Sequence, residues 1–520
     1  MIRPRSEGYD AVIVGGGIGA LTAAAYLARG KGRVLLLEAG TSFAGRAQTM
    51  EFAPGFRAPK LAHVVYALDG RAVRELRLAD HGLEFANPNM RSAALGPGGK
   101  HILLPAAGRR AHAPFSQHSG LDICAYRSFR NTAMRLARLL RPLWGGVLAC
   151  PWSAQGDDRI ATLIGRLQLG ARDSGALEEL TRLSAAAYLD RWFESDALKT
   201  ALAFDVFPSG LSPQEAGSAL VLIWRYAQEN RDRQGAVSQI RGGPGTLAAV
   251  LEAVAKKAGA ELRVSAQVSA IIVEKRRAIG VALAGGEMIP AGAVLSGLDS
   301  PQALFDLLPA DAIGFGMAHS TAQGEKLATA QVLLGLSGPP PFAGLDAADL
   351  AARLVIAGRT ETASEAKNAA LNGDFATELA LEVTVPTIAD PSLAPKSCHV
   401  LSALLAYMPA ASPGAWEAHR EALKKRVLTT LEGFAPGLKE RIVAQRVVMP
   451  DAASPVGGTA SSQSISTRLL ASYEARMRTP IAGLYLCGEI AEPVSAISGR
   501  AGRLAAGLVV MDGQAGGARP

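Results

Sequence analysis

The chain has 520 residues, 49% of them hydrophobic, and this length leads us to expect two domains. It has no apolar run of the roughly 18 residues that a membrane span needs, so we expect no span. The net charge is +8, but the basic residues are spread along the chain without aromatic interleaving, which favours a generally basic surface and excludes nucleic-acid binding. The cysteines, Cys124, Cys150, Cys398 and Cys487, form no CxxC pair, so neither a disulfide framework nor a metal site is expected and a reducing cytoplasm fits.

The first predicted elements, in residues 9–40, are a strand, a glycine turn, a helix and a second strand. The polar stretch before them is not expected to be a signal peptide. Gly15, Gly17 and Ala20 fall at the spacing GxGxx[G/A]. Gly15 permits the tight turn, Gly17 lets a pyrophosphate approach the backbone, and the small Ala20 lets the helix lie close to the strand. Because the N-terminus of a helix also attracts phosphate, this order predicts a dinucleotide-binding βαβ unit.

An acidic residue and a basic turn follow the second strand. Glu38 ends that strand, where a carboxylate can accept both ribose hydroxyls of an adenosine and disfavours a 2′-phosphate, so NADP is not expected. Gly45 and Arg46 form a turn just beyond it, where a planar guanidinium is suited to a pyrophosphate. The alternative for Arg46 is an ordinary surface arginine.

The next recognisable segment is a predicted helix, RSFRNTAMRLARLLRPLW, at residues 127–144. Its arginines alternate with leucine and methionine. Such a helix can lie on an anionic membrane surface, or it can be solvated, with arginine stems covering apolar surface. Both interpretations stay open from the sequence.

Residues 242–297 predict a glycine turn, a helix, a strand, a hairpin and an apolar strand. Gly285 and Gly286 occupy the hairpin turn. Val268 stands at a strand end, from which its backbone could reach a ligand.

A second glycine–acid turn lies near the C-terminus, in LYLCGEIAEPVSAISGRAGR (484–503). LYLC predicts a short buried strand, Gly488 permits close passage of a ligand chain, and Glu489 can accept a bond from a polyol hydroxyl. A ribityl chain that crosses the sheet needs such a second acid, so the pair of turns predicts FAD. The helix start near residues 498–502 is expected to stabilise the reduced flavin. The stretch after Gly488 offers only Glu, Ser and Arg, and Cys487 lies within the strand, so the flavin is expected to be non-covalent.

These blocks, with SEAKNAALNGDF (364–375) and VPTIADPSLAP (385–395), resemble the phytoene-desaturase-like FAD-dependent oxidoreductases, and most of all their branch with a pyridine-nucleotide-disulphide-oxidoreductase domain. The resemblance implies FAD held by discontinuous segments and a domain for a lipophilic substrate. It also implies that the Val268 backbone pairs with adenine. The resulting cofactor-binding residues are Gly15, Gly17, Ala20, Glu38, Gly45, Arg46, Val268, Gly488, Glu489 and Ile497.

Two stretches depart from the family pattern. Glu492, Pro493 and Val494 stand where the family usually has His-Pro-Gly, and Pro59 and Lys60 stand where it often has an acid. No GxSxG, HExxH or Walker motif is present, so the flavin is expected to carry the chemistry. Weak catalytic candidates are Glu492 and His63. The latter lies near the flavin if the segment after the arginine turn crosses behind it, as in the family, and is otherwise a structural or surface histidine.

The predicted fold is α/β, with a Rossmann-like FAD-binding domain in three segments (1–86, 236–310 and 451–520) and an inserted α+β substrate domain (87–235 and 311–450). The predicted function is oxidation or isomerisation of a lipophilic small molecule by C–H hydride transfer to flavin N5. The alternatives are a flavin amine oxidase and a non-catalytic, FAD-stabilised binding protein. We expect a cytoplasmic protein with peripheral contact to the inner face of a membrane. The sequence does not indicate an oligomeric state.

Overall fold

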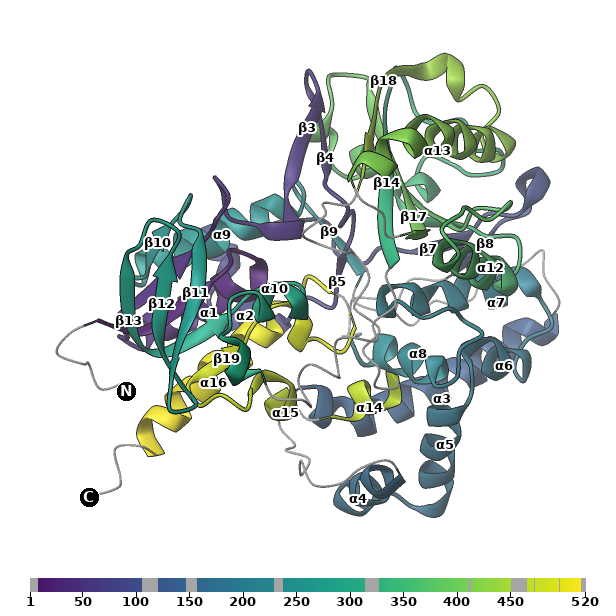
Figure 1. The fold of residues 1–520 in the computed structure, drawn as a ribbon. Coiled ribbons are helices and arrows are strands. Elements are labelled where there is room, and N and C mark those ends of the chain that lie inside the picture. The colour runs from purple at the N-terminus through teal and green to yellow at the C-terminus, as the bar shows by residue number, and fades with distance from the viewer. Residues whose placement is uncertain are drawn as a thin grey trace.

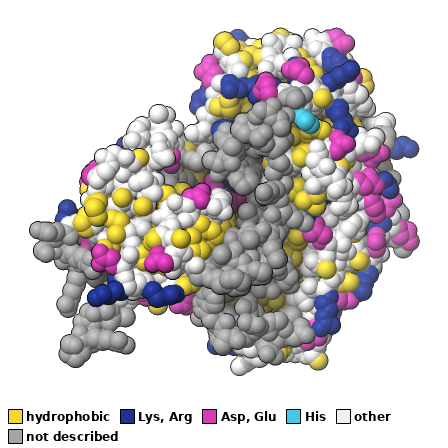
Figure 2. All heavy atoms as spheres, in the orientation of Figure 1, with side chains coloured by type: hydrophobic (Ala, Val, Ile, Leu, Met, Phe, Trp, Pro, Cys, Tyr) yellow, Lys and Arg dark blue, Asp and Glu magenta, His cyan; other side chains and the backbone are white. Residues whose placement is uncertain are grey.

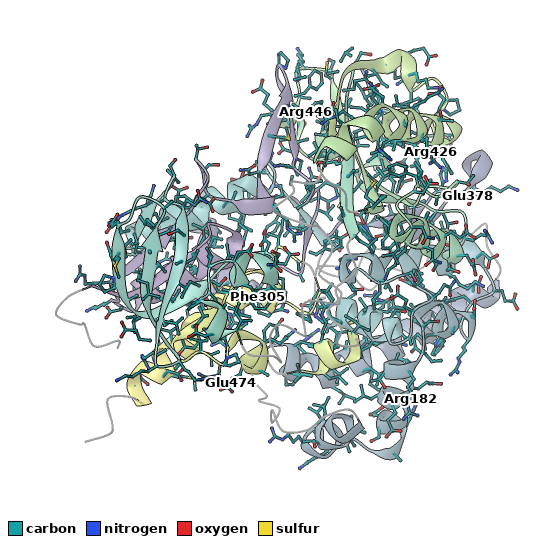
Figure 3. All side chains as sticks on the ribbon, viewed as in Figure 1. Arg182, Phe305, Glu378, Arg426, Arg446 and Glu474 are labelled. Carbon is teal, nitrogen blue, oxygen red and sulfur yellow. The ribbon has the colours of Figure 1, made fainter. Side chains whose placement is uncertain are left out.

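The computed structural model describes residues 8–104, 120–145, 157–228, 237–313, 327–409, 413–449, 465–471, 473–494 and 496–515. These residues form two lobes, each built around one seven-stranded sheet (Figure 1). Side chains fill the space between the layers of each lobe (Figure 3). The lobes share one continuous hydrophobic core, which runs from the helices of the first lobe into those of the second.

The first sheet has the order β10-β2-β1-β13-β12-β11, with β19 also paired to β13. The pairs among β10, β2, β1, β13 and β19 are parallel, whereas β11, β12 and β13 form antiparallel hairpins. Its strands therefore come from three distant parts of the sequence, which confirms the predicted mixed α/β fold with a Rossmann-like domain. The strands are β1 (Tyr9–Val14), β2 (Val34–Leu37), β10 (Glu261–Arg263), β11 (Val268–Glu274), β12 (Arg277–Leu283), β13 (Met288–Ser296) and β19 (Leu484–Leu486).

Three helices pack on this sheet: α1 (Ile18–Arg29), α9 (Pro244–Lys257) and α16 (Arg500–Ala515). Helices α1 and α16 approach each other closely because glycines stand at their crossing. A Cβ on Gly502 of α16 would lie 1.9 Å from the backbone oxygen of Gly19 in α1, and a Cβ on Gly19 would lie 2.0 Å from that of Cys487. The small residues of these segments thus hold α1 against both α16 and the end of β19.

The second sheet has the order β18-β14-β17-β16-β15-β7-β8 and is antiparallel except between β15 and β7. Helices α12 (Thr360–Leu371) and α13 (Pro413–Phe434) pack against its apolar faces. Its strands are β7 (Ser92–Ala94), β8 (Ile102–Leu104), β14 (Leu327–Leu336), β15 (Arg353–Ile356), β16 (Leu381–Thr384), β17 (His399–Pro409) and β18 (Ile442–Val448).

A helical layer completes the second lobe below this sheet (Figure 1). Its helices are α3 (Gly120–Trp144), α4 (Asp157–Leu167), α5 (Ala171–Arg182), α6 (Ala185–Asp190), α7 (Asp196–Ala203), α8 (Ser218–Ala227) and α14 (Ile465–Leu470). The short helix α15 (Tyr473–Met477) instead packs against α16 and β19 of the first lobe. Between the lobes run the hairpin β3 (Thr49–Ala53) and β4 (Phe56–Pro59), and a small sheet of β5 (Val65–Tyr66), β9 (Val237–Ile240) and β6 (Phe85–Asn87). Two further short helices are α2 (Gly70–Glu75) and α10 (Pro301–Phe305).

The predicted basic helix is α3, and its apolar side packs against α8. Several of its arginines have partners within the chain. Arg135 pairs with Asp173, the guanidinium of Arg130 lies 5.5 Å from the ring centre of Tyr226, and Arg141 donates to the Ala227 carbonyl. On the face drawn in Figure 2, basic and acidic side chains of the described residues are interspersed. Membrane contact through α3 therefore stays a prediction.

Candidate active site

The turn after β1 forms as its glycines predict. Gly15 has φ of +94°, a left-handed conformation that favours glycine, and its amide donates to the Leu37 carbonyl. Gly17 precedes α1 in an extended conformation, without a side-chain cap, and no atom lies within 4 Å of where its Cβ would stand. A Cβ on Gly297, at the end of β13, would lie 2.7 Å from the Ala20 Cβ, so Ala20 does allow the close helix–strand approach. The start of α1 thus faces open space.

Glu38 and Val268 belong to the scaffold of this turn. The Glu38 carboxylate accepts from the Gly16 amide at 2.6 Å and from the Gly40 amide at 2.7 Å. It therefore closes the loop between β1 and β2, and its further acceptor sites stay available to hydroxyl groups. Val268 begins β11 and packs in the core beneath Leu37.

Two short 3-10 turns meet across the cavity. Gly45 begins the first with φ of +54°, and a Cβ there would lie 3.3 Å from the Cα of Gly17. Arg46 of that turn forms an ion pair with Glu489 of the second, and its Nε lies 3.9 Å from Asp299. Burial lowers the pKa of Arg46, opposed by the charge of Asp299. The structure thus joins the predicted basic turn at Arg46 to the predicted glycine–acid turn at Glu489, although 443 residues separate these two side chains in number.

The packing of two strand ends also requires glycine at position 488. A Cβ at this position would lie 2.6 Å from the carbonyl carbon of Gly297, so only glycine lets the end of β19 lie against the end of β13. The preceding Cys487 is fully buried, and burial raises the pKa of its thiol to about 12. The protonated thiol is a poor nucleophile, which is consistent with the predicted absence of a covalent flavin link.

One cavity of about 1220 Å³, part of it open to solvent, connects these turns with the second sheet. Of the predicted residues, Gly17, Arg46, His63, Gly488, Glu489, Glu492 and Ile497 line it. Gly15, Ala20, Glu38, Gly45 and Val268 do not; they shape or support the first turn. The remaining wall is largely apolar and includes Leu61, Val64, Phe207, Leu327, Leu404 and Tyr407.

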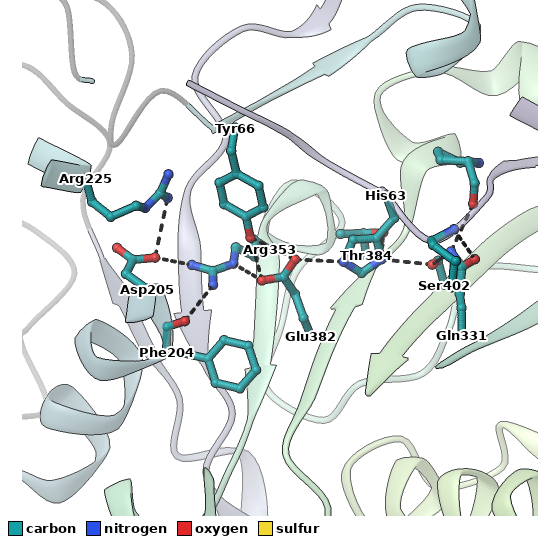
Figure 4. A network of polar contacts seen from close by, with 12 residues as sticks. His63, Tyr66, Phe204, Asp205, Arg225, Gln331, Arg353, Glu382, Thr384 and Ser402 are labelled. Atoms are coloured by element: carbon teal, nitrogen blue, oxygen red, sulfur yellow. Dashed lines mark hydrogen bonds and ion pairs between the residues drawn. The ribbon is translucent and has the colours of Figure 1, made fainter. Parts of the chain in front are cut away.

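His63 lies in a buried polar network that the sequence did not predict (Figure 4). Its Nε2 is 2.8 Å from Glu382 and its Nδ1 is 2.9 Å from Ser402. Since a carboxylate only accepts, Nε2 carries the proton that bonds Glu382. Glu382 also accepts from the Tyr66 hydroxyl and from Arg353. Both ring nitrogens of His63 are thus engaged within the chain.

Three ion pairs hold this network together. Arg353, which is fully buried, bonds Glu382 on one side and Asp205 on the other, and Asp205 also pairs with Arg225. Burial would raise the pKa of Glu382, but Arg353 and His63 outweigh it and hold that pKa well below its usual range. The only hint in the sequence was a single charge within each of two otherwise apolar strands, ARLVIAG and ALEVTVP.

Glu492 caps α16 rather than facing a ligand alone. Its Oε1 accepts from the Ser498 hydroxyl at 2.6 Å and from the Ala501 amide at 3.1 Å. The Ser498 hydroxyl in turn accepts from the Arg500 amide. The sequence predicts that the amides at this helix start stabilise reduced flavin. Its first amides already have partners in the chain, so they are not free to bond a flavin.

An aromatic pair lies on the cavity wall. The rings of Phe207 and Tyr407 are 5.6 Å apart at an interplanar angle of 87°, and the Tyr407 hydroxyl donates to the Leu211 carbonyl. An edge-to-face pair presents only one ring face toward a common point. This differs from a cage in which two faces enclose a cation.

The described residues fit a bound dinucleotide. The start of α1 meets open space at Gly17, a guanidinium and a carboxylate face each other at Arg46 and Glu489, and one cavity joins them. Amide dipoles and a guanidinium suit phosphates, and a carboxylate suits hydroxyl groups. Among the described residues, no helix is long and apolar enough to cross a membrane, and no cluster of His, Cys, Asp and Glu has a geometry for a metal ion.

Comparison with known proteins supports this interpretation. Residues 13–77 match the model of an NAD(P)-binding Rossmann-like domain. The chain is 29% identical to the pyridine nucleotide-disulfide oxidoreductase domain-containing protein 2 of Rattus norvegicus, over 97% of this chain and 94% of that protein. It is 28% identical to the neurosporene-forming phytoene desaturase of Cereibacter sphaeroides, over 59% of each.

Among solved structures, a putrescine oxidase redesigned in its cofactor binding matches with a TM-score of 0.62 and 15% identity, over 97% of this chain and 99% of that one. This likeness shows the fold alone. The curated relatives confirm the predicted resemblance to the phytoene-desaturase-like FAD-dependent oxidoreductases. Those relatives are oxidoreductases, which also confirms the prediction that this chain is one.

Proposed function

We propose that this oxidoreductase, a homologue of the FAD-dependent desaturases, binds FAD non-covalently in the cavity and oxidises or isomerises a neutral, lipophilic small molecule. The observation that carries the proposal is the single cavity that runs from the start of α1 to the apolar face of the second sheet. The phytoene desaturase among its relatives supports a substrate of this class.

Residues of all three segments would hold the cofactor. The start of α1 at Gly17 and the guanidinium of Arg46 would bind the phosphates, and Glu38 and Glu489 would accept hydroxyl groups. Val268 would offer its backbone to the adenine, and Ile497 would pack on the wall. When bound, FAD supplies an acceptor for a hydride at its N5.

The residues on the substrate side of the cavity would position the substrate and exclude water. The apolar side chains of Leu61, Val64, Phe207, Leu327 and Leu404 would exclude water and hold a C–H bond near the acceptor. Neither task needs a nucleophile. The chain would thus act by orientation within an apolar enclosure.

The charges on the wall favour a neutral substrate. Four carboxylates line the cavity, and each has a hydrogen-bond or ion-pair partner within the chain. Glu382 bonds Arg353, Tyr66 and His63; Asp299 and Glu489 lie beside Arg46; Glu492 caps α16. A cationic amine would therefore have to displace one of these partners, at a cost in free energy.

Two alternatives have specific support. The fold of the putrescine oxidase and the Phe207–Tyr407 pair favour an amine oxidase, but the edge-to-face rings and the engaged carboxylates do not supply an amine cage. The altered sequence near Glu492 favours a flavin-stabilised binding protein without turnover.

The test has two parts. The nucleotide released by denaturation is identified by chromatography; we expect FAD, in the supernatant after acid precipitation. Anaerobic stopped-flow reduction then compares polyisoprenoids, retinoids, fatty acyl compounds and amines. Reduction by amines alone would favour the amine oxidase, and no reduction by any of them would favour the binding protein. Purification with NAD alone, or a yellow precipitate, would contradict the cofactor assignment.

A further inference from the structure

The first turn of α16 is closed by side chains of its own chain. The Ser498 hydroxyl accepts from the Arg500 amide at 2.9 Å, and Glu492 Oε1 accepts from the Ala501 amide at 3.1 Å. Ser498, Ala501 and Glu492 also line the cavity. A full negative charge therefore stands on the cavity wall at a place where helix amides would otherwise present partial positive charge.

The contacts of Glu492 identify its charge state. It is buried, with 6% of its surface exposed, and its partners are the Ser498 hydroxyl, the Ala501 amide and the Tyr473 hydroxyl. The Ser498 hydroxyl accepts from an amide and the Tyr473 hydroxyl accepts from Arg500, so both donate their own protons to Glu492. A carboxylate with three donors is the ionised form.

Positive charge lies behind this carboxylate. The Arg500 guanidinium donates to the Tyr473 hydroxyl, which bonds Glu492, and donates at its other end to Gln228. The Arg476 guanidinium stacks 4.1 Å from the centre of the Tyr473 ring. Neither arginine lines the cavity, whereas Glu492 does. The cavity therefore faces the negative member of this cluster.

We propose that Glu492 lowers the two-electron reduction potential of FAD bound in this cavity. The proposal rests on the proposed function, because it requires a flavin. Uptake of two electrons and one proton adds a negative charge to the flavin, and a carboxylate on the same wall opposes it. A lower potential makes the reduced cofactor a stronger electron donor to its acceptor. It also makes oxidised FAD a weaker oxidant, so the substrate must carry a C–H bond that releases its hydride readily.

Glu492→Gln tests the proposal, because glutamine keeps the size of the side chain and removes the charge. We expect FAD to remain bound and the two-electron equilibrium to shift at least tenfold toward reduction, which corresponds to a rise of about 30 mV. The measurement is an anaerobic reductive titration with dithionite against a reference dye. An unchanged or lower potential would overturn the proposal.

Tyr473→Phe provides a second variant with the opposite expectation. It removes one donor from Glu492, leaves the charge and does not alter the cavity wall, so the potential should fall. A general loosening of the helix start would instead shift both variants in the same direction, and that result would overturn the proposal. If Glu492→Gln does not retain flavin, the reduction potential of Tyr473→Phe decides: a fall supports the proposal, and an unchanged or higher potential overturns it.

Asp512→Asn serves as the matched control. Asp512 lies at the other end of the same helix, paired with Arg478, and does not line the cavity, so its removal should leave the potential within about threefold, or about 15 mV, of the wild type. A shift as large as that of Glu492→Gln would overturn the proposal. Wild-type protein without FAD would instead contradict the proposed function.

Discussion

At the turn after β1, the start of α1 meets the cavity without a side-chain cap, whereas the start of α16 is closed by Ser498 and Glu492. Each helix follows a strand and a glycine turn, and the two helices pack against each other. They differ in what the nearby carboxylate bonds: Glu38 bonds the loop before α1, whereas Glu492 bonds the first turn of α16 itself.

The same contrast holds for the cavity as a whole. Around Gly17 the wall offers backbone amides to a ligand, but at the other end His63 is bonded on both ring nitrogens, to Glu382 and to Ser402. A polar group that faces the cavity without a partner in the chain can strengthen the binding of a ligand. One that is hydrogen-bonded within the chain contributes to the stability of the fold instead. Substitutions at the open end should therefore change binding, and those at the closed end should change stability.

The largest expected effect would test the open end directly. Gly17→Val should abolish FAD retention, because the side chain would enter the phosphate path, while the extended backbone and open space allow the chain to fold. The flavin absorbance of the purified protein measures this. Gly285→Val is the control, since that glycine lies in a hairpin turn with equal space. Full flavin occupancy in Gly17→Val would contradict the idea that the start of α1 is the ligand-binding end of the cavity.

The closed end should respond in stability. Glu382→Gln leaves Arg353 buried without its main partner, and should lower the free energy of unfolding by about 3–5 kcal/mol at pH 7, with FAD still bound. Chemical denaturation measures it. Glu287→Gln, which breaks a half-exposed pair with Arg263, should cost less than about 1 kcal/mol. Equal losses in both would contradict the role of burial.

The acid dependence of the same variant sharpens this prediction. Because the pKa of folded Glu382 lies below its ordinary value, its contribution is present above about pH 4.3, the ordinary pKa of glutamate, and is lost as the pH falls through the folded pKa. The difference between wild type and Glu382→Gln should therefore shrink below about pH 4. A difference that grows on acidification would contradict the assignment.

A smaller effect is expected at the edge of the open end. Glu38→Ala should weaken FAD binding by about 1–3 kcal/mol, the scale of hydrogen bonds to a charged group. Titration of the flavin-free protein with FAD measures this change. Glu252→Ala, a surface residue of α9 paired with Lys256, should leave the affinity unchanged. An equal affinity for Glu38→Ala would place the adenosine elsewhere.

The smallest effect should be on chemistry at the closed end. His63→Ala should slow flavin reduction by less than about 100-fold, below the range for removal of a true general acid or base. Glu492→Ala should slow it no more than that, because the lost charge otherwise opposes reduction. Stopped-flow reduction of the flavin-loaded variants measures the rates. Complete loss with FAD still bound would show that one of these side chains carries the reaction.

Much of the first lobe followed from local sequence. The turn at Gly15 and the hairpin at Gly286 lie where glycine spacing predicted them. These features depend on backbone sterics within a few residues. The second lobe lacked such motifs, so the sequence predicted its class but neither its strand order nor its role in the cavity.

The sequence by itself determined the dinucleotide turn and the place of the second acid at Glu489, because glycine spacing and hydrophobic pattern act over short distances along the chain. Only the tertiary structure decided that Arg353 and Glu382 neutralise each other, that His63 has no free ring nitrogen and that Glu492 closes α16. Such partners are set by which buried groups meet, and an unpaired buried charge costs several kcal/mol, about 3–5 when one member of a pair is lost. That requirement appears only when distant segments pack together.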